Sequence, residues 1–138
     1  MSYLLDTNVL SETRKRQCNA GVRRWISGID PERLHVSVIT VGELGRGVAR
    51  LRQRGDQEQA DMFERWLDDL IDGFGSRVLS VDSRVVRGWS AQPVSRTMPT
   101  ADALIAATAA VYSLTLVTRN TADFDGVGIQ LVNPFDNA

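Results

Sequence analysis

The sequence predicts one α/β domain in which helices cover both faces of a central, mostly parallel sheet of four to five strands. Short apolar runs alternate along the chain with longer segments whose apolar residues recur every three or four positions, and this alternation is typical of parallel α/β folds. The chain has 138 residues, of which 43% are hydrophobic and 24% charged, enough for one domain with a real core. We therefore expect a three-layer α/β/α domain that spans residues 1–138.

The first half of the chain predicts two strands and four helices. Tyr3–Leu5 is a short apolar run that ends at Asp6, which indicates a buried strand followed directly by a helix. The next expected elements are a helix at 20–29, an alternating strand at 34–38, a helix at 40–53 and an amphipathic helix across 61–72. The apolar side of that last helix is expected to carry Met62, Phe63, Trp66, Leu67, Leu70 and Ile71. Its other side is charged, so we expect it to pack on the core with one face.

The second half of the chain continues the alternation of strands and helices. Asp82 follows an apolar run and is the expected N-terminal cap of a helix. Two prolines indicate a loop before the alanine-rich segment that follows. The expected elements are a strand at 77–81, a helix at 82–91, a loop at 92–99, a helix at 100–112, and strands at 114–118 and 129–132.

The composition excludes several kinds of chemistry. With one His and one Cys, the chain lacks the residues for a zinc site, for Cys–His nucleophilic catalysis or for a pair of catalytic histidines. Carboxylates must therefore carry any hydrolytic chemistry. The net charge is −1, but 15 of the 16 cationic side chains are arginines, whose planar guanidinium suits bidentate contact with phosphate. A nucleic-acid substrate remains compatible with this composition.

The sequence predicts a cytoplasmic protein that is not embedded in a membrane. Its N-terminus lacks the basic and apolar regions of a signal peptide, and the lone Cys18 cannot form an internal disulfide. The longest apolar stretch, 103–116, contains polar residues and is shorter than the roughly 20 residues that a membrane span needs.

Four acidic residues fall at positions that the fold should bring together: Asp6, Glu43, Asp102 and Asp123. Ligands of open parallel sheets bind beyond the carboxyl ends of the strands, where Asp6 and the loop that holds Asp123 are expected. Helices that follow strands begin at the same edge. Glu43, expected in the first turn of its helix, and Asp102 should therefore lie near the other two.

A divalent cation is the natural partner of such a cluster. Asp102 shares a helix face with Ile105 and Ala109, so its carboxylate is expected to be buried, and a buried charge costs several kcal/mol unless it is paired or holds a metal. Further carboxylates cannot neutralise it, and without a cation like-charge repulsion should raise at least one pKa. Magnesium, or alternatively manganese, suits an all-oxygen site.

Each acid, taken alone, also has a local explanation. Asp6 can cap the helix that follows it, Glu43 can pair with Arg46 or Arg50 along its own helix, and Asp123 can form an Asx turn. The joint arrangement is harder to explain in this way, because caps and turns do not require the four acids to meet.

Four segments of the sequence resemble the PIN domain, and the resemblance spans nearly the whole chain. They are Tyr-Leu-Leu-Asp-Thr-Asn-Val-Leu-Ser-Glu at 3–12, Val-Gly-Glu-Leu around Glu43, Asp-Ala-Leu-Ile-Ala-Ala-Thr-Ala from Asp102, and Leu-Val-Thr-Arg-Asn-Thr-Ala-Asp-Phe ending at Phe124. Among PIN proteins the chain is most similar to the VapC and FitB type, the toxins of bacterial toxin–antitoxin pairs.

This resemblance implies a magnesium-dependent endoribonuclease whose acidic quartet is Asp6, Glu43, Asp102 and Asp123. It implies polar support for the quartet from Asn8, Thr118 and Asn120. It also implies a homodimer, inhibition by a small antitoxin of the VapB or FitA kind, and contact with operator DNA only through that antitoxin. The expected reaction is in-line attack of an activated water on the phosphorus of RNA, which leaves 3′-hydroxyl and 5′-phosphate ends.

Three arginines could guide RNA toward the acids. Arg46, Arg50 and Arg54 recur every four residues on the side of the helix that carries Glu43. They form either a phosphate-binding track or simply a solvated helix face.

Two other functions remain as alternatives. A haloacid-dehalogenase-like phosphatase also places an aspartate after its first strand, but it needs a second acid where this chain has Asn8, and the only lysine, Lys15, comes too early for that family's phosphate-binding role. The other alternative is a catalytically silent module that binds RNA or an antitoxin. The intact acidic quartet argues against a protein without catalytic activity.

Overall fold

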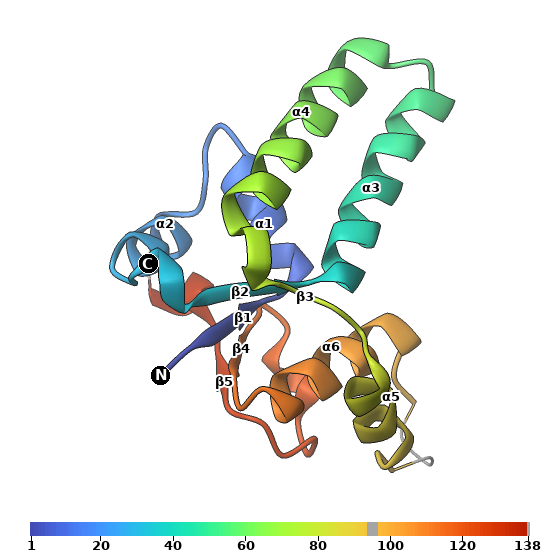
Figure 1. Ribbon diagram of the computed structural model, residues 1–138. Coiled ribbons are helices and arrows are strands. Elements are labelled where there is room, and N and C mark those ends of the chain that lie inside the picture. The colour runs from blue at the N-terminus through green and yellow to red at the C-terminus, as the bar shows by residue number, and fades with distance from the viewer. Residues whose placement is uncertain (94–96, 138) are drawn as a thin grey trace.

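In the computed structural model, which describes residues 1–93 and 97–137, helices cover both faces of a five-stranded sheet (Figure 1). The strands are β1 (Tyr3–Leu5), β2 (Leu34–Ser37), β3 (Val78–Leu79), β4 (Thr115–Val117) and β5 (Leu131–Val132). Their order in the sheet is β3-β2-β1-β4-β5, and each neighbouring pair is parallel. The expected α/β class and the expected parallel sheet are both confirmed.

The helices form the two outer layers. They are α1 (Thr7–Arg14), α2 (Ala20–Ser27), α3 (Val38–Gln53), α4 (Gln57–Phe74), α5 (Ser83–Ser90) and α6 (Thr100–Val111). Short 3-10 helices follow at η1 (Pro31–Arg33), η2 (Gly75–Arg77), η3 (Thr121–Phe124) and η4 (Pro134–Asn137). Figure 1 shows α1 to α4 on one side of the sheet and α5 and α6 on the other.

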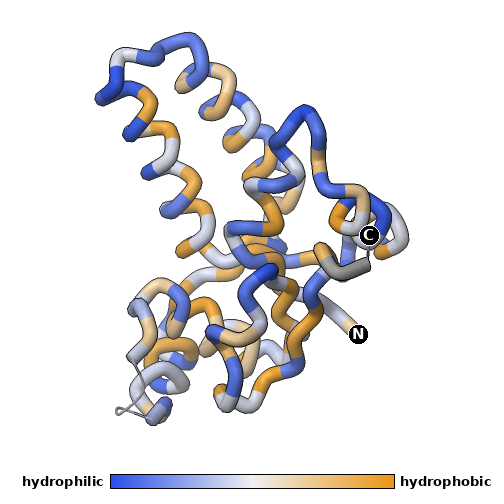
Figure 2. Tube along the Cα trace, turned by 180° about the vertical axis from the view of Figure 1, so that it is seen from behind, coloured by the Kyte–Doolittle hydropathy of each residue, from blue (hydrophilic) through white to orange (hydrophobic). Residues whose placement is uncertain are grey.

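Adjacent leucines of β1 supply the cores on the two faces of the sheet, because successive strand side chains point in opposite directions. Leu4 packs with α6 residues, among them Ile105, and Leu5 packs with residues of α1 and α2, among them Val9 and Val22. All five side chains are almost completely buried. Figure 2 shows apolar residues gathered along the strands, whereas the turn between α3 and α4 is hydrophilic.

The strand order reverses direction between β1 and β4. The chain proceeds from β1 to β2 and β3 on one side, and then α5 and α6 return it to β4 on the other side of β1. The backbone N–H of Asp6 donates to the Val117 carbonyl at 2.9 Å, so the carboxyl ends of β1 and β4 lie side by side. Such a switch point is where open α/β sheets bind their ligands.

Helices α3 and α4 form a long hairpin that projects away from the sheet (Figure 1). Their seam is made of apolar side chains, chiefly Leu44, Val48, Ala60, Phe63 and Leu67. Near the turn, the guanidinium of Arg52 on α3 forms ion pairs with Asp61 at 2.9 Å and Glu64 at 2.6 Å on α4. These contacts hold the two helices together at their far end.

The start of α3 differs from the expectation. The Ser37 side chain accepts a hydrogen bond from the Ile39 N–H, so the helix begins at Val38 and the preceding strand ends one residue sooner than expected. Glu43 therefore lies in the second turn of α3, and its expected place in the first turn is wrong. Met62 was expected on the buried side of α4, but it is 51% exposed because the contacts with α3 lie on the other side of the helix.

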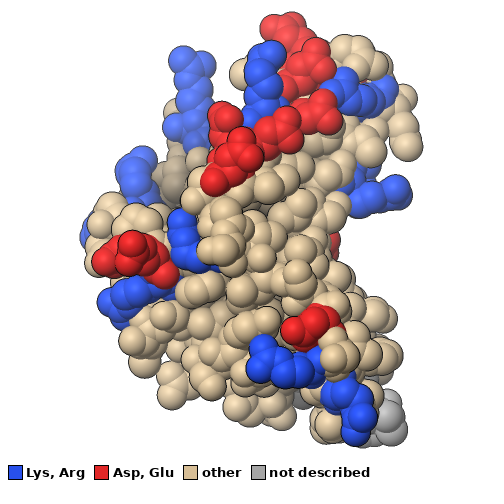
Figure 3. All heavy atoms as spheres, in the orientation of Figure 1, with Lys and Arg blue, Asp and Glu red and all other residues tan. Residues whose placement is uncertain are grey.

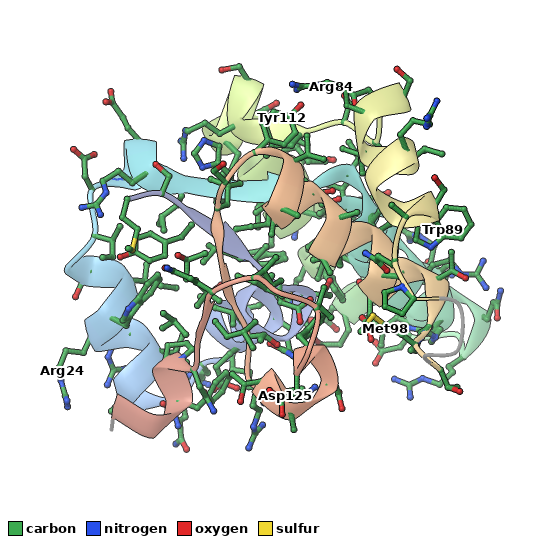
Figure 4. The ribbon with its side chains drawn as sticks, turned by 90° about the horizontal axis from the view of Figure 1, so that it is seen from below. Arg24, Arg84, Trp89, Met98, Tyr112 and Asp125 are labelled. Atoms are coloured by element: carbon green, nitrogen blue, oxygen red, sulfur yellow. The ribbon has the colours of Figure 1, made fainter. Side chains whose placement is uncertain are left out.

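The second half of the chain follows the expected order. Asp82 caps α5 by accepting a hydrogen bond from the Val85 N–H at 3.1 Å, as expected. Helix α5 packs on α6, and Figure 4 shows Arg84 beside Tyr112, where the guanidinium lies 5.2 Å from the ring centroid. Residues 94–96 of the expected loop lie outside the described residues. Within the described part, no helix combines the length and apolarity that a membrane span needs.

Candidate active site

Asp6 lies at the centre of the switch point, where its side chain is only 5% exposed. One carboxylate oxygen, Oδ1, accepts from the Thr7 N–H at 2.8 Å and so caps α1, while Oδ2 accepts from the Thr118 hydroxyl at 2.8 Å. Burial raises the pKa of Asp6, the bonds from Thr118 and Thr7 lower it, and the negative charges of Glu43 and Asp123 raise it again, with a net upward shift. The carboxylate is thus desolvated and surrounded by like charge.

The three expected supporting residues all belong to one network around Asp6. Thr118 Oγ1, which donates to Asp6, accepts from the Asn120 N–H at 3.1 Å and from Asn8 Nδ2 at 3.4 Å. Asn8 Nδ2 also lies 3.5 Å from Asp6 Oδ2, and Asn8 Oδ1 accepts from the Arg119 N–H at 3.2 Å. Asn8 therefore fastens the start of α1 to the loop after β4.

Glu43 reaches the same edge of the sheet from α3. Its Oε1 accepts from the Thr7 hydroxyl at 2.5 Å, and Thr7 Oγ1 lies 3.1 Å from Oγ1 of Thr40. Glu43 could instead pair with Arg46 or Arg50 along its own helix. Among the described residues, neither ion pair is formed. Sequence reasoning missed Thr7 and Thr40, although Thr7 directly follows Asp6 and Thr40 precedes Glu43 by three residues, close to one helical turn.

Asp102 lies in the first turn of α6 and is half-buried, so it is more accessible to solvent than its place on an apolar helix face predicts. Partial burial raises the pKa of Asp102, and the charges of Asp6, Glu43 and Asp123 raise it further. Like-charge repulsion acts as expected, but for both Asp6 and Asp102 burial is the larger cause.

Asp123 approaches the cluster from η3, the short helix after β4. Its backbone N–H donates to the Asn120 carbonyl at 3.0 Å, which fixes the turn, and the residue as a whole is exposed. Its charge nevertheless acts on Asp6 and Asp102. Asp123 is therefore the most solvent-accessible of the four acids, and it lies in η3, in the segment that follows β4.

The cluster is suited to a hard divalent cation. Across residues 1–93 and 97–137, no three acidic, histidine or cysteine side chains are arranged as a ready-made metal site. Magnesium does not need one, because it keeps several waters and is usually bound through one or two carboxylates. The donors here are all oxygens, and the excess of negative charge needs a cation to offset it. This donor chemistry fits Mg²⁺ or Mn²⁺.

Arg46, Arg50 and Arg54 lie exposed along α3 and at its C-terminal end. In the part of the chain that the structure describes, none of the three forms an ion pair with an acidic residue. Figure 3 shows basic side chains projecting beside α3 and a separate stripe of acidic side chains along α4. The exposed acidic residues of that helix are Glu58, Asp61, Glu64, Asp68, Asp69 and Asp72.

Comparison with known proteins gives the family. The family model of the PIN domain matches residues 3–129. The chain belongs to the PIN domain family. It is 36% identical to the plasmid stability protein StbB of Pseudomonas syringae pv. tomato, over 96% of this chain and 98% of that protein. It is 31% identical to the VapC ribonuclease Y4jK of Sinorhizobium fredii, over 98% of this chain and 99% of that protein.

The named relatives and a solved structure place this PIN domain with the VapC and FitB type. The crystal structure of FitAcB from Neisseria gonorrhoeae superposes with a TM-score of 0.86 at 33% identity and covers 96% of this chain and 98% of that chain. A toxin–antitoxin complex from Klebsiella pneumoniae superposes with a TM-score of 0.65 at 25% identity, over 96% and 98% of the two chains. The resemblance found in the sequence is thus confirmed at the level of family and fold.

Proposed function

We propose that this PIN domain is a magnesium-dependent endoribonuclease and the toxin of a toxin–antitoxin pair. The observation that carries the proposal is that four carboxylates, from four separate segments, lie close enough at the switch point of the sheet for their charges to act on one another. Two of them, Asp6 and Asp102, have raised pKa values because they are desolvated among like charges. Such a costly arrangement is expected at a functional site rather than at helix caps and turns.

Asp6, Glu43, Asp102 and Asp123 are the residues that would hold Mg²⁺, with Mn²⁺ as a substitute. When bound, the cation would stabilise the charge that develops on the phosphate and make a water molecule more acidic. The chain itself orients the ligands: Thr118 donates to Asp6, while Asn8 and the Asn120 N–H hold Thr118. Hydrogen bonds of this kind, made to the side chains that hold a metal, fix the direction of the ligand oxygens.

Proteins similar to this chain support the proposed partners. One relative is named a ribonuclease, and one similar structure is a toxin–antitoxin complex. We propose RNA as the substrate, a small antitoxin as the inhibitor, and a homodimer as the working form in the cytoplasm. Contact with operator DNA is assigned to the antitoxin, as the resemblance to VapC and FitB toxins implies.

RNA cleavage by the purified full chain tests the proposal. Wild type should cleave RNA with Mg²⁺ and not with EDTA, and should leave 5′-phosphate and 3′-hydroxyl ends. Asp6→Asn should abolish cleavage. Asp82→Asn should not, because Asp82 also caps a helix after a strand but belongs to α5, outside the cluster.

The same experiment separates the alternatives. A silent binding module predicts RNA binding without cleavage by either protein. A phosphatase predicts release of phosphate from small phosphomonoesters and intact RNA. Cleavage that survives EDTA, or fragments that end in cyclic phosphates, would contradict the proposed mechanism.

A further inference from the structure

Two threonines connect Glu43 to the helix that begins beside Asp6. Thr40 is fully buried in α3, and its hydroxyl lies 3.1 Å from that of Thr7 in α1. The Thr7 hydroxyl in turn donates to Glu43 Oε1 at 2.5 Å. A buried polar group lowers stability unless it is hydrogen-bonded. The Thr40 hydroxyl therefore needs a partner, and the Thr7 hydroxyl supplies it.

The number of protons on each hydroxyl shows which group donates and which accepts in these contacts. A threonine hydroxyl has one proton to donate and lone pairs to accept with. The carboxylate is the stronger acceptor and makes the shorter contact, so the Thr7 proton lies on the bond to Glu43. Thr7 Oγ1 then accepts the proton of Thr40. Because a hydroxyl that accepts becomes a better donor, Thr40 strengthens the bond between Thr7 and Glu43.

Thr7 also contacts a second acid of the cluster. Its backbone N–H donates to Asp6 Oδ1, while its side chain donates to Glu43 Oε1. One residue at the first position of α1 therefore holds two carboxylates from different elements. It engages one oxygen of each and leaves Glu43 Oε2 free of that bond.

We propose that Thr7, supported by Thr40, is a positioning residue that presents the Glu43 carboxylate to a divalent cation through Oε2. This inference rests on the proposed function, in which Glu43 is a metal ligand. A glutamate side chain is long and has several rotatable bonds, so an unrestrained Glu43 would lose conformational freedom on binding the cation. The Thr7 bond removes part of that freedom beforehand.

Calorimetric titration of Mn²⁺ into the purified full chain tests the proposal. Thr7→Val has nearly the same shape as threonine but no hydroxyl, and should weaken Mn²⁺ binding by about 10- to 100-fold, the usual effect of losing a partner of a metal ligand. Thr7→Ser keeps the hydroxyl and should bind as wild type does. Thr13→Val is the matched control, because the Thr13 hydroxyl donates to the Leu10 carbonyl of the same helix, away from the acids.

A double-mutant cycle with Glu43→Gln shows whether the effect passes through Glu43. Thr7→Val should add no further loss of Mn²⁺ affinity in the Glu43→Gln background. A general structural weakening would instead lower the affinity in both backgrounds. If Thr7→Val does not fold, as judged by its melting curve, Thr40→Val takes its place, with a loss of affinity expected in the same direction.

The outcomes separate this inference from the proposed function. Wild-type affinity in Thr7→Val, together with weakened binding in Glu43→Gln, would overturn the positioning role alone. Equal losses in Thr7→Ser and Thr7→Val would also overturn it, because the hydroxyl would then be irrelevant. Absence of Mn²⁺ binding by wild type, or full binding by Glu43→Gln, would contradict the metal-site proposal itself.

Discussion

Asp6 has partners nearby in α1 and one distant partner after β4. Oδ1 caps α1 through the Thr7 N–H, and this contact follows from the sequence just after β1. Oδ2 receives the Thr118 hydroxyl, and this contact exists only because β4 pairs with β1 in the sheet. The local capping explanation of Asp6 and the metal-site explanation are therefore compatible, since each carboxylate oxygen has two lone pairs and can serve more than one partner.

Replacing Asp6 with asparagine is expected to stabilise the metal-free protein at neutral pH. Burial, and to a lesser degree the charges of Glu43 and Asp123, raise the pKa of Asp6 in the folded state. The folded protein thus binds this proton more tightly than the unfolded chain, so wild-type stability falls as pH rises from about 4 through the folded pKa. Asparagine keeps the helix cap and carries no charge, although its amide nitrogen cannot accept the Thr118 hydroxyl as Oδ2 does. Melting temperatures in EDTA measure the difference.

The advantage of Asp6→Asn over wild type should grow as pH rises from acid values, where Asp6 is protonated in both the folded and the unfolded chain, through the raised folded pKa. Asp82→Asn is the control, because it also replaces a capping aspartate with asparagine, but on α5 and outside the cluster. A stability difference between Asp6→Asn and wild type that does not change with pH would contradict the account of Asp6 as a carboxylate kept charged at a cost.

The partners of Glu43 show which part of the site the sequence could not predict. Its acidic character and its place after a strand indicated that it would lie near Asp6. The contact with Thr7 depends on the crossing of α1 and α3, which are separated by 36 positions at these two residues. No periodicity or spacing rule specifies such a contact, so the supporting threonines were missed.

At the scale of elements, the α3–α4 hairpin depends on a close approach at Gly47. A Cβ atom added to Gly47 would lie 2.9 Å from Cε2 of Phe63. That ring is buried and also contacts the guanidinium of Arg14, 3.8 Å from its centroid, and the ring of Trp66. Phe63 has little room to move, so glycine is required at this crossing.

Gly47→Ala should therefore lower the free energy of unfolding by about 1 to 3 kcal/mol, the usual effect of overpacking a core. Gly45→Ala is the matched control on the same helix, because an added Cβ there has no heavy atom within 4 Å outside its own surroundings. It should raise stability by about 0.5 to 1 kcal/mol, since alanine is the better helix former. Denaturant unfolding measures both. Equal effects of the two substitutions would contradict the packing described for α3 and α4.

The arginines of α3 predict a salt-dependent contact with RNA. Replacing Arg46, Arg50 and Arg54 with glutamine, in the Asp6→Asn background to prevent cleavage, should weaken binding of single-stranded RNA. The slope of log affinity against log salt should fall by about 2, because each phosphate that an arginine neutralises adds roughly 0.7 to the slope. Binding measured across a range of salt concentrations gives both quantities.

The control for this experiment replaces three other exposed arginines, Arg16, Arg23 and Arg65. Their removal should leave the salt slope nearly unchanged, although the net charge changes equally. If both triple variants lose affinity to the same degree, the arginines of α3 are a solvated face and not a track.

Element boundaries were less predictable than element types. The sequence indicated the strands and helices in the right order, because their apolar periodicities differ. It placed the start of α3 too late, since the side chain of Ser37 was not recognised as a cap. It also predicted a longer strand around β3, where only Val78–Leu79 pairs with β2.

At the scale of the whole molecule, the order of the strands explains where the acids meet. Alternating strands and helices predicted a parallel sheet, but not which strands are neighbours. The observed order puts β1 between β2 and β4, so the segments that follow β1, β2 and β4 begin at one edge of the sheet. Asp6, Glu43 and Asp123 belong to these three segments, and α6 adds Asp102. The site is thus a consequence of topology.

An anomalous difference map from a crystal of the full chain grown with Mn²⁺ tests the central claim most directly. We predict a manganese peak at the carboxyl edge of β1 and β4, in contact with Asp6 and at least one of Glu43, Asp102 and Asp123. A map in which this edge is empty, while the carboxylates form ordinary ion pairs or bind only water, would contradict the claim.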